Sequence, residues 1–247
     1  MALLLASGLF NTLAKLIAGV DDAGRGPIIG PLVVAGVLIP NELQQWLKAI
    51  GVRDSKLLTP GVRTQLDAKI RESALKVSVV EAQPREIDDC VFHGSRLRRL
   101  NHLEARMMAK VVADLAPEEA YVDASDVNEA RYGEDIREFL PNNLKRIRIV
   151  SEHHADRTFP VVSAGSIIAK VWRDARVGEL CNKYGDFGSG YLTDPKTMSF
   201  LRSWRQTHRD YPPIVRLSWR PLESLRLKLV NRGWERNQKV PLEFRTL

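Results

Sequence analysis

The stretch LIAGVDDAGRGPIIGPLVVAGVLI, residues 16–39, carries the clearest indication of the fold. It contains two apolar runs, residues 16–20 and 31–39, which are short and rich in valine, leucine and isoleucine, as strands are. The segment between them is rich in glycine and predicts a turn. The stretch therefore predicts a hairpin of two central strands.

Outside this hairpin, apolar residues alternate between strand-like runs and helical spacing, which predicts an α/β domain of packed layers. Further strands are expected at residues 77–80, 121–122 and 147–150. Helices are expected after Pro40-Asn41, from Pro60 with Thr59 as N-cap, over residues 94–115, from Ser163 as N-cap, and over residues 195–207 and 221–230.

The composition changes after Asn182, first to a loop at residues 185–193 and then to basic helical segments. We therefore predict a main domain at residues 1–190, in which residues 1–14 are an N-terminal extension. Residues 191–247 are expected to form a C-terminal helical appendage with a basic tail.

The composition of the 247 residues, 44% hydrophobic and 27% charged, is that of a folded globular protein and excludes disordered and fibrous classes. Because 37 Lys and Arg outnumber 30 Asp and Glu, the net charge of +7 favours a polyanionic partner. Cys90 and Cys181 lack metal or disulfide spacing, so we expect two buried free thiols and a reduced, cytoplasmic setting. Residues 1–20 are interrupted by polar residues such as Asn11 and Lys15, which favours a helical turn or strand over a signal peptide or membrane span.

Four acidic residues follow the predicted strands. Asp21 and Asp22 come after residues 16–20, Asp123 comes after Tyr121-Val122, and Asp156 comes after the strand near Ile149. Adjacent carboxylates repel each other unless a cation, a proton or strong hydrogen bonds compensate them, although a solvated turn with an aspartate cap is the simpler explanation of the pair alone. Because the carboxyl ends of neighbouring strands converge in α/β sheets, we expect the four acids to gather. Such a cluster suits Mg²⁺ or Mn²⁺ and phosphodiester hydrolysis with two metal ions.

The nine residues Gly19-Val20-Asp21-Asp22-Ala23-Gly24-Arg25-Gly26-Pro27 resemble the opening signature of ribonuclease HII, especially of the archaeal type. Further stretches fit that family in order: Asp54-Ser55-Lys56, Leu100-Asn101, Leu103-Glu104, Tyr121-Val122-Asp123, Ala155-Asp156, Val161-Val162-Ser163-Ala164, Ser166-Ile167-Ile168-Ala169-Lys170, Gly188-Ser189-Gly190-Tyr191, Pro213-Ile214-Val215-Arg216 and Ser218-Trp219. The resemblance implies an RNase H-like mixed five-stranded sheet flanked by helices. It also implies catalytic, metal-binding roles for Asp21, Asp22, Asp123 and Asp156.

The turn at Gly24, Arg25 and Gly26 is the expected reader of the substrate. Its glycines let backbone groups approach a sugar, and Arg25 can bind a phosphate as a forked donor, although a tight turn alone also requires glycine. The resemblance implies that this turn contacts the ribose 2′-hydroxyl and that Tyr191 packs on the sugar 3′ of the ribonucleotide. It therefore implies cleavage of hybrid RNA, and cleavage 5′ to single ribonucleotides in duplex DNA, leaving 3′-hydroxyl and 5′-phosphate ends.

Basic residues are the expected phosphate contacts. Lys56 is favoured because it lies in a matching motif, whereas Arg202, Arg205 and Arg209 are either phosphate contacts or simply solvated. The tail at residues 238–244 faintly resembles a peptide that binds a sliding clamp. We expect a monomer whose partners are RNA/DNA hybrids and DNA duplexes that contain ribonucleotides.

The sequence departs from the family pattern at Asp22, where glutamate is usual, so the spacing of the metal ligands is in doubt. It also departs at His154, Phe159 and Gly165, where lysine, tyrosine and alanine are common. A zinc cluster of His153, His154 and Asp156 is disfavoured because no cysteine or third histidine lies nearby. Two other functions stay open: a hybrid-binding protein with impaired catalysis, and another RNase H-like nuclease that cuts DNA.

Overall fold

The computed structural model describes residues 14–93, 99–220 and 222, and its centre is a five-stranded mixed sheet. The strands are β1 (Leu16–Ala23), β2 (Leu32–Pro40), β3 (Lys76–Ala82), β4 (Glu119–Asp123) and β5 (Arg148–Glu152), in the order β3-β2-β1-β4-β5. The pairs β1–β2 and β2–β3 are antiparallel, whereas β1–β4 and β4–β5 are parallel. The predicted hairpin, the five strands and the α/β class are confirmed.

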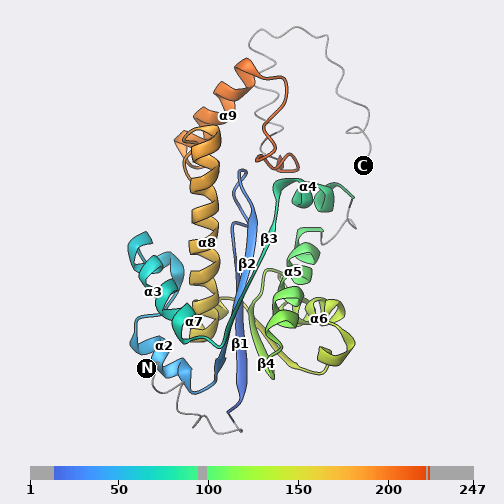
Figure 1. The fold of residues 1–247 in the computed structure, drawn as a ribbon. Coiled ribbons are helices and arrows are strands. Elements are labelled where there is room, and N and C mark those ends of the chain that lie inside the picture. The colour runs from blue at the N-terminus through green and yellow to red at the C-terminus, as the bar shows by residue number, and fades with distance from the viewer. Residues whose placement is uncertain (1–13, 94–98, 221, 223–247) are drawn as a thin grey trace.

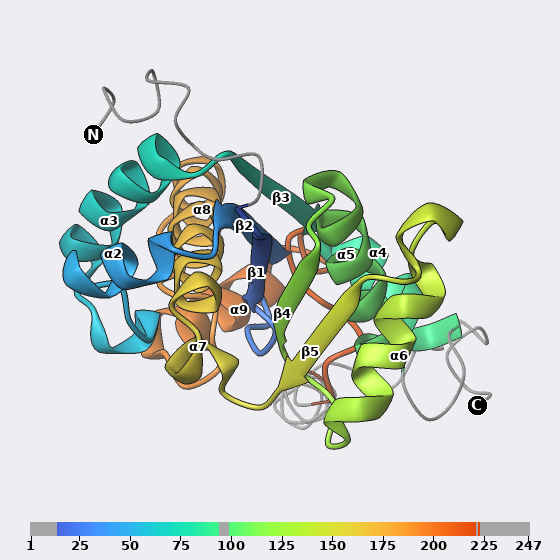
Figure 2. The same cartoon turned by 90° about the horizontal axis from the view of Figure 1, so that it is seen from below.

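Helices cover both faces of this sheet (Figures 1 and 2). One face carries α2 (Leu43–Ala49), α3 (Pro60–Ser73), α7 (Ala155–Thr158) and α8 (Pro160–Tyr184); the other carries α4 (Pro84–His93), α5 (Arg99–Leu115) and α6 (Glu129–Phe139). Two single turns of 3₁₀ helix, η1 (Ser55–Leu57) and η2 (Asn142–Leu144), lie in the loops, and α9 (Pro195–Thr207) follows α8 at the end of the molecule that carries the hairpin tip (Figure 1).

The hairpin lies at the centre because its strands are buried on both faces. All nine residues of β2 are buried, and its alternate side chains enter two apolar clusters, one against α5 and one against α8. Helix α8 packs directly on β1 at Gly19, where an added Cβ would lie 2.2 Å from the carbonyl carbon of Val161. Glycine therefore permits the close approach of α8 to the strand that carries Asp21 and Asp22.

A third apolar cluster joins the hairpin tip to the C-terminal region. Ile28 and Ile29 pack there with Phe187, with Leu201 of α9 and with Val215. The predicted division of the chain at residue 190 thus crosses one continuous cluster. The division itself stays a prediction.

Local signals fixed several helix ends correctly. Thr59 caps α3 through its side chain, as predicted, and α9 spans the predicted residues. The predicted N-cap at Ser163 is wrong: α8 begins at Pro160, and the hydroxyl of Ser163 donates to the carbonyl oxygen of Asp156. Proline is preset for the first position of a helix, so the helix starts earlier than the serine indicated.

Helices α4 and α6 were not predicted. Residues 94–98 of the predicted helix at 94–115, the tail at 223–247 and the extension at 1–13 lie outside the described residues.

The two cysteines are free, as predicted, but they are half-buried rather than buried. Each packs against the edge of an apolar cluster, which leaves its other side open. No helix in the described ranges is both long enough and apolar enough to span a bilayer.

Candidate active site

Three of the predicted acids meet where parallel strands end. Val20 of β1 pairs with Val122 of β4, so Asp21 and Asp123 follow at the same level of the sheet. Asp156 lies in the first turn of α7, directly after β5. Asp21 and Asp156 are each only 5% exposed, so the explanation of Asp21 as part of a solvated turn is wrong.

The acidic pair is divided between the two faces of the sheet. Strand β1 continues to Ala23, so Asp21 and Asp22 lie within it, and successive side chains in a strand point to opposite faces. Asp21 accepts a hydrogen bond from the amide of Asp22 at 2.7 Å, and Ser166 of α8 opposes the rise in the pKa of Asp21. Asp22 lies 3.4 Å from the hydroxyl of Ser125 and within the electrostatic field of Arg25.

Burial and mutual repulsion favour the neutral forms of these acids. Burial raises the pKa of Asp21 well above its ordinary value, and the charges of Asp22 and Asp123 raise it further. Burial raises the pKa of Asp123 to about 6, although the amide of Ala155 donates to its carboxylate at 2.8 Å and opposes the rise. Burial also raises the pKa of Asp22 and of Asp156. A bound cation would therefore stabilise the charged forms of these carboxylates.

The donor set of this cluster fits a hard divalent cation, which prefers carboxylate oxygens. The ligand set is open in the described structure, because no three carboxylate, imidazole or thiolate groups among the described residues already have the spacing that holds an ion. The side chains would therefore have to adjust around a bound ion.

Lys56 lies on the same side of the molecule as the acids. Its segment is fixed by Asp54, which accepts from the Lys56 amide at 3.0 Å, and by the hydroxyls of Ser55 and Ser166, which are 3.0 Å apart. The ammonium group opposes the rise in pKa of Asp22, Asp123 and Asp156. The structure thus brings Lys56 close to the acids, as the motif suggested.

The glycine turn and Tyr191 are neighbours, although 165 positions separate Gly26 from Tyr191 in the sequence. An added Cβ on Gly26 would lie 3.4 Å from the tyrosine ring. The amide of Ile28 donates to the carbonyl of Gly190 at 2.8 Å, which holds the two loops together. Tyr191 is 37% exposed, so its ring can contact a ligand. Gly24 has a φ of +87° and also satisfies the requirement of a tight turn.

The side chain of Arg25 does not extend freely into solvent. It donates to Glu104 and, at 2.8 Å, to Asn101, both on α5. Glu104 is fully buried, and burial raises its pKa to about 8 against the opposing charge of Arg25. Asn101 and Glu104 lie in stretches that match the family, but we predicted no function for them from the sequence.

Two buried arginines beside the turn were also given no function. Arg173 of α8 donates to the carbonyl of Ser189 at 2.7 Å, and its guanidinium lies 5.5 Å from the ring centre of Tyr191. Arg216 donates to the carbonyls of Gly24, Arg25 and Gly30. The motif Pro213-Ile214-Val215-Arg216 was the available signal for Arg216.

Comparison with known proteins decides the family. The family model described as Ribonuclease HII matches residues 18–221. This chain belongs to the ribonuclease HII family. It is 44% identical over 224 residues to the ribonuclease HII of Methanosarcina barkeri, and the matched region covers 88% of this chain and 98% of that protein.

Solved structures of family members have the same fold. The crystal structure of ribonuclease H2 from Pyrococcus horikoshii matches with a TM-score of 0.79 and 38% identity, over 89% of this chain and all of that one. RNase HII from Archaeoglobus fulgidus, solved as a PCNA:RNase HII complex, matches with a TM-score of 0.73 and 35% identity, over 93% of this chain and all of that one. The resemblance stated from the motifs is confirmed.

The alternative zinc cluster gains no support from the geometry. His153 pairs its ring nitrogen with the carbonyl of Ala124 at 3.2 Å, and His154 has a left-handed backbone with a φ of +56°. Within the described residues, these two histidines and Asp156 do not form a group that could hold a metal ion.

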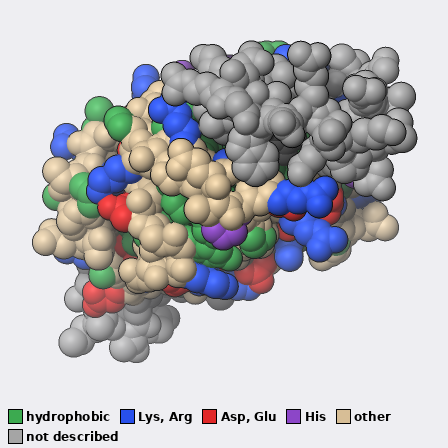
Figure 3. All heavy atoms as spheres, turned by 90° about the horizontal axis from the view of Figure 1, so that it is seen from above, with side chains coloured by type: hydrophobic (Ala, Val, Ile, Leu, Met, Phe, Trp, Pro, Cys, Tyr) green, Lys and Arg blue, Asp and Glu red, His purple; other side chains and the backbone are tan. Residues whose placement is uncertain are grey.

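Arg202, Arg205 and Arg209 lie on or after α9, away from the sheet (Figure 1). Seen from above, Lys and Arg side chains are spread over the described surface with acidic side chains between them (Figure 3). Arg205 packs on the ring of Tyr211 with 5.4 Å between guanidinium and ring centre.

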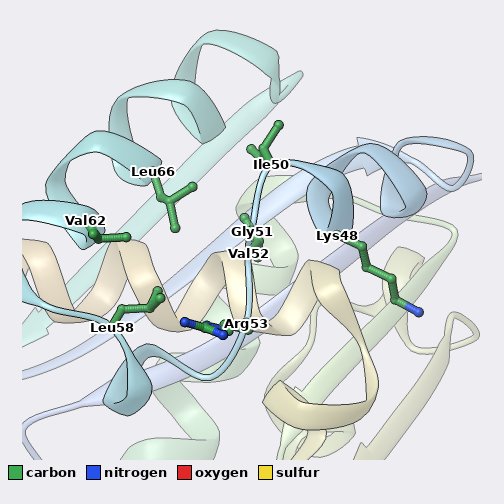
Figure 4. Close-up of a pocket in the computed structure, with 8 residues that line it drawn as sticks. All are labelled: Lys48, Ile50, Gly51, Val52, Arg53, Leu58, Val62 and Leu66. Atoms are coloured by element: carbon green, nitrogen blue, oxygen red, sulfur yellow. The ribbon is translucent and has the colours of Figure 1, made fainter.

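A cavity of about 500 Å³ lies between α2 and α3 (Figure 4). Its wall is mostly apolar, with Lys48 and Arg53 as its charged residues. None of the residues predicted to bind metal or substrate lines it, so it is separate from the ribonuclease HII site.

Proposed function

We propose that this protein is an endonuclease which hydrolyses the RNA strand of RNA/DNA hybrids and cleaves 5′ to ribonucleotides in duplex DNA. Membership of the ribonuclease HII family supports the endonuclease activity. The proposed substrate rests on the closeness of Gly26 and Tyr191. A backbone turn and an aromatic ring are neighbours there, next to strand β1 with its acidic residues.

Asp21, Asp22, Asp123 and Asp156 would hold the divalent metal ions, which we propose to be Mg²⁺ or Mn²⁺. Bound metal lowers the pKa of an attacking water and neutralises charge on the leaving oxygen. The protein's own groups would place the phosphodiester: Lys56 and Arg25 attract the phosphates, and the ring of Tyr191 packs on the sugar. The 3′ oxygen leaves as a hydroxyl, and the phosphate stays on the 5′ end of the ribonucleotide.

The turn at residues 24–26 is the proposed sensor of the 2′-hydroxyl. Gly26 presents exposed backbone without a side chain, which lets a sugar come close to its peptide groups, whereas Gly24 is buried and supplies the positive φ of the turn. Since the 2′-hydroxyl is the atom that separates RNA from DNA, contact there would restrict cleavage to ribonucleotides.

A DNA duplex with one ribonucleotide tests the proposal in the presence of Mg²⁺, Mn²⁺ or EDTA. We expect one metal-dependent nick on the 5′ side of the ribonucleotide and none in the all-DNA duplex of the same sequence. Binding without nicking in either metal would favour a hybrid-binding protein with impaired catalysis, which the departure at Asp22 motivates. Equal cutting of both duplexes would favour a DNA-directed nuclease.

We also propose that a sliding clamp such as PCNA binds residues 238–244, which lie outside the described residues. The relative from Archaeoglobus fulgidus was solved as a complex with PCNA, and this supports the proposal. Truncation after Asn237 should abolish measured affinity for the clamp while leaving nicking unchanged. Undiminished clamp binding would exclude the tail. Monomeric state and cytoplasmic location stay predictions.

A further inference from the structure

Residues 214–219, which we call the C-terminal strap, lie along the hairpin tip (Figure 1). The amide of Gly30 donates to the carbonyl of Ile214 at 2.9 Å, and the amide of Arg216 donates to the carbonyl of Ile28 at 2.8 Å. Ile29 and Val215 form an antiparallel bridge. The strap thus pairs with the segment that immediately follows the proposed sugar-reading turn.

Arg216 reaches from the strap into the turn. Its guanidinium donates to the carbonyls of Gly24 at 2.6 Å, Arg25 at 2.9 Å and Gly30 at 3.0 Å. The side chain is fully buried, and burial with the nearby charge of Arg173 lowers its pKa to about 9. It therefore stays charged at neutral pH and makes three charge-assisted hydrogen bonds.

Trp219 completes the hold on the turn. Its indole nitrogen donates to the carbonyl of Gly26 at 3.1 Å, and the Arg216 guanidinium lies 4.9 Å from the tryptophan ring centre. The carbonyl oxygens of the three successive turn residues are thus all bonded to the strap.

Holding these carbonyls also orients the amides of the turn. In a planar trans peptide the C=O and N–H bonds point in opposite directions. The carbonyl of Gly24 shares a peptide plane with the amide of Arg25, and the carbonyl of Arg25 shares one with the amide of Gly26. Arg216 therefore directs both N–H groups away from itself, and within the described residues neither donates to an acceptor. Bonding of a peptide carbonyl to a cation also polarises its N–H into a stronger donor.

The strap is anchored independently of the turn. Asp88 of α4 is buried and accepts from the amides of Leu217 at 2.8 Å and Ser218 at 2.9 Å, and from the Ser218 hydroxyl at 2.6 Å. The strap is thereby tied to the helical layer that packs on the sheet opposite α8. The position of Arg216 is therefore set by α4 together with the pairing of the strap with residues 28–30.

We propose that the C-terminal strap sets the ribose selectivity of this enzyme, with Arg216 as a positioning residue that aims the amides of Arg25 and Gly26 at the 2′-hydroxyl oxygen. This inference rests on the proposed function, in which the turn reads the sugar. Selectivity for RNA is then built from two distant parts of the chain, and Asp88 contributes to it without touching the turn.

The test measures kcat/KM for a duplex with one ribonucleotide and for the same duplex with deoxyribose there, in Mn²⁺. It also measures equilibrium binding of both duplexes without metal. Arg216→Lys keeps a cation but loses the fork that reaches several carbonyls. Since one lost hydrogen bond changes an equilibrium by roughly fivefold, misaligning two amides should lower the ribose-to-deoxyribose ratio by at least about tenfold. Asp88→Asn should lower the same ratio, by less, because it loosens only the anchor.

Arg137→Lys is the matched control. Arg137 of α6 also clasps two backbone carbonyls, those of Lys145 at 2.6 Å and Ile147 at 2.9 Å, but contacts no residue of the turn. It should leave the ratio unchanged. If Arg216→Lys and Asp88→Asn lower cleavage of both duplexes equally, the strap is merely structural and the inference is overturned. If Arg216→Lys does not fold, Asp88→Asn alone decides. A wild-type protein without ribose selectivity would instead refute the proposed function.

Discussion

Replacing Glu104 by glutamine should remove a large part of the pH dependence of stability in the metal-free protein. Glu104 is fully buried, and burial raises its pKa from 4.5 to about 8. Below the pKa that Glu104 has in the unfolded chain, the carboxyl is protonated in both the folded and the unfolded state, so it does not change the free energy of unfolding. As the pH rises from 4.5, the unfolded chain releases the proton and the folded protein keeps it, so stability falls by about 1.4 kcal/mol per pH unit. The loss is complete at about pH 8 and amounts to roughly 5 kcal/mol.

The window from pH 6.5 to 8 isolates this group from Asp123, whose raised pKa of about 6 lies below it. Between these two pH values the free energy of unfolding of the wild-type protein should fall by roughly 2 kcal/mol relative to that of Glu104→Gln. Glutamine still offers an oxygen to Arg25, and any cost of burying its amide is independent of pH.

Urea unfolding in EDTA at pH 6.5, 7.25 and 8 measures the difference between the two proteins. Glu138→Gln on the exposed face of α6 is the control, and its difference from wild type should stay constant. A Glu104→Gln difference that stays flat or narrows as the pH rises would show that Glu104 is already ionised in the folded protein and that burial does not hold it neutral.

Four further substitutions test the site. Asp21→Asn should lower the nicking rate by more than roughly a hundredfold, as loss of one electrostatic contact in an active site does, yet preserve duplex binding in a mobility-shift assay; a wild-type rate would remove Asp21 from the metal site. Asp22→Glu should lower the metal concentration for half-maximal nicking, because the longer side chain reaches further, and an unchanged titration contradicts this. Gly24→Ala should destabilise the protein by about 2–4 kcal/mol in urea, because the φ of +87° strains alanine and its Cβ would lie 2.6 Å from the carbonyl oxygen of Pro31; an unchanged midpoint contradicts it. Lys56→Ala should reduce the slope of log affinity against log salt by about 0.9, and an unchanged slope would mean that Lys56 contacts no phosphate.

The sheet and the gathering of acids followed from local patterns. Apolar runs and a glycine-rich turn define β1 and β2 because strand length and turn chemistry are properties of neighbouring residues. Asp21, Asp123 and Asp156 could be placed together because the carboxyl ends of adjacent parallel strands share one edge. The alternation that sends Asp21 and Asp22 to opposite faces follows only once β1 is known to continue through both.

The helices that were missed carry weaker local signals. Helix α6 begins after Asn128, whose side chain caps it, but this asparagine lies in a polar loop that also suits an irregular segment. Helix α4 is short, and its start is marked only by Pro84 and by Glu86 in the first turn. The N-terminus of α8 was misplaced because Ser163 offered a capping side chain, while its hydroxyl bonds to Asp156 instead.

The buried charges were beyond sequence reasoning. Arginine and glutamate are ordinarily exposed, so the sequence did not indicate that Arg216, Arg173 and Glu104 are buried beside the glycine turn, although Arg216 and Glu104 lie in matching motifs. Their burial depends on how the C-terminal strap, α8 and α5 converge on one turn. Such convergence is a property of the tertiary structure.

Cleavage of a DNA duplex that carries a single ribonucleotide tests directly whether this protein recognises a ribose within DNA. We expect one nick 5′ to that ribonucleotide in Mg²⁺ or Mn²⁺, with 3′-hydroxyl and 5′-phosphate ends, and none in EDTA or in the all-DNA duplex. Cleavage that persists in EDTA, or that ignores the ribonucleotide, would contradict this expectation.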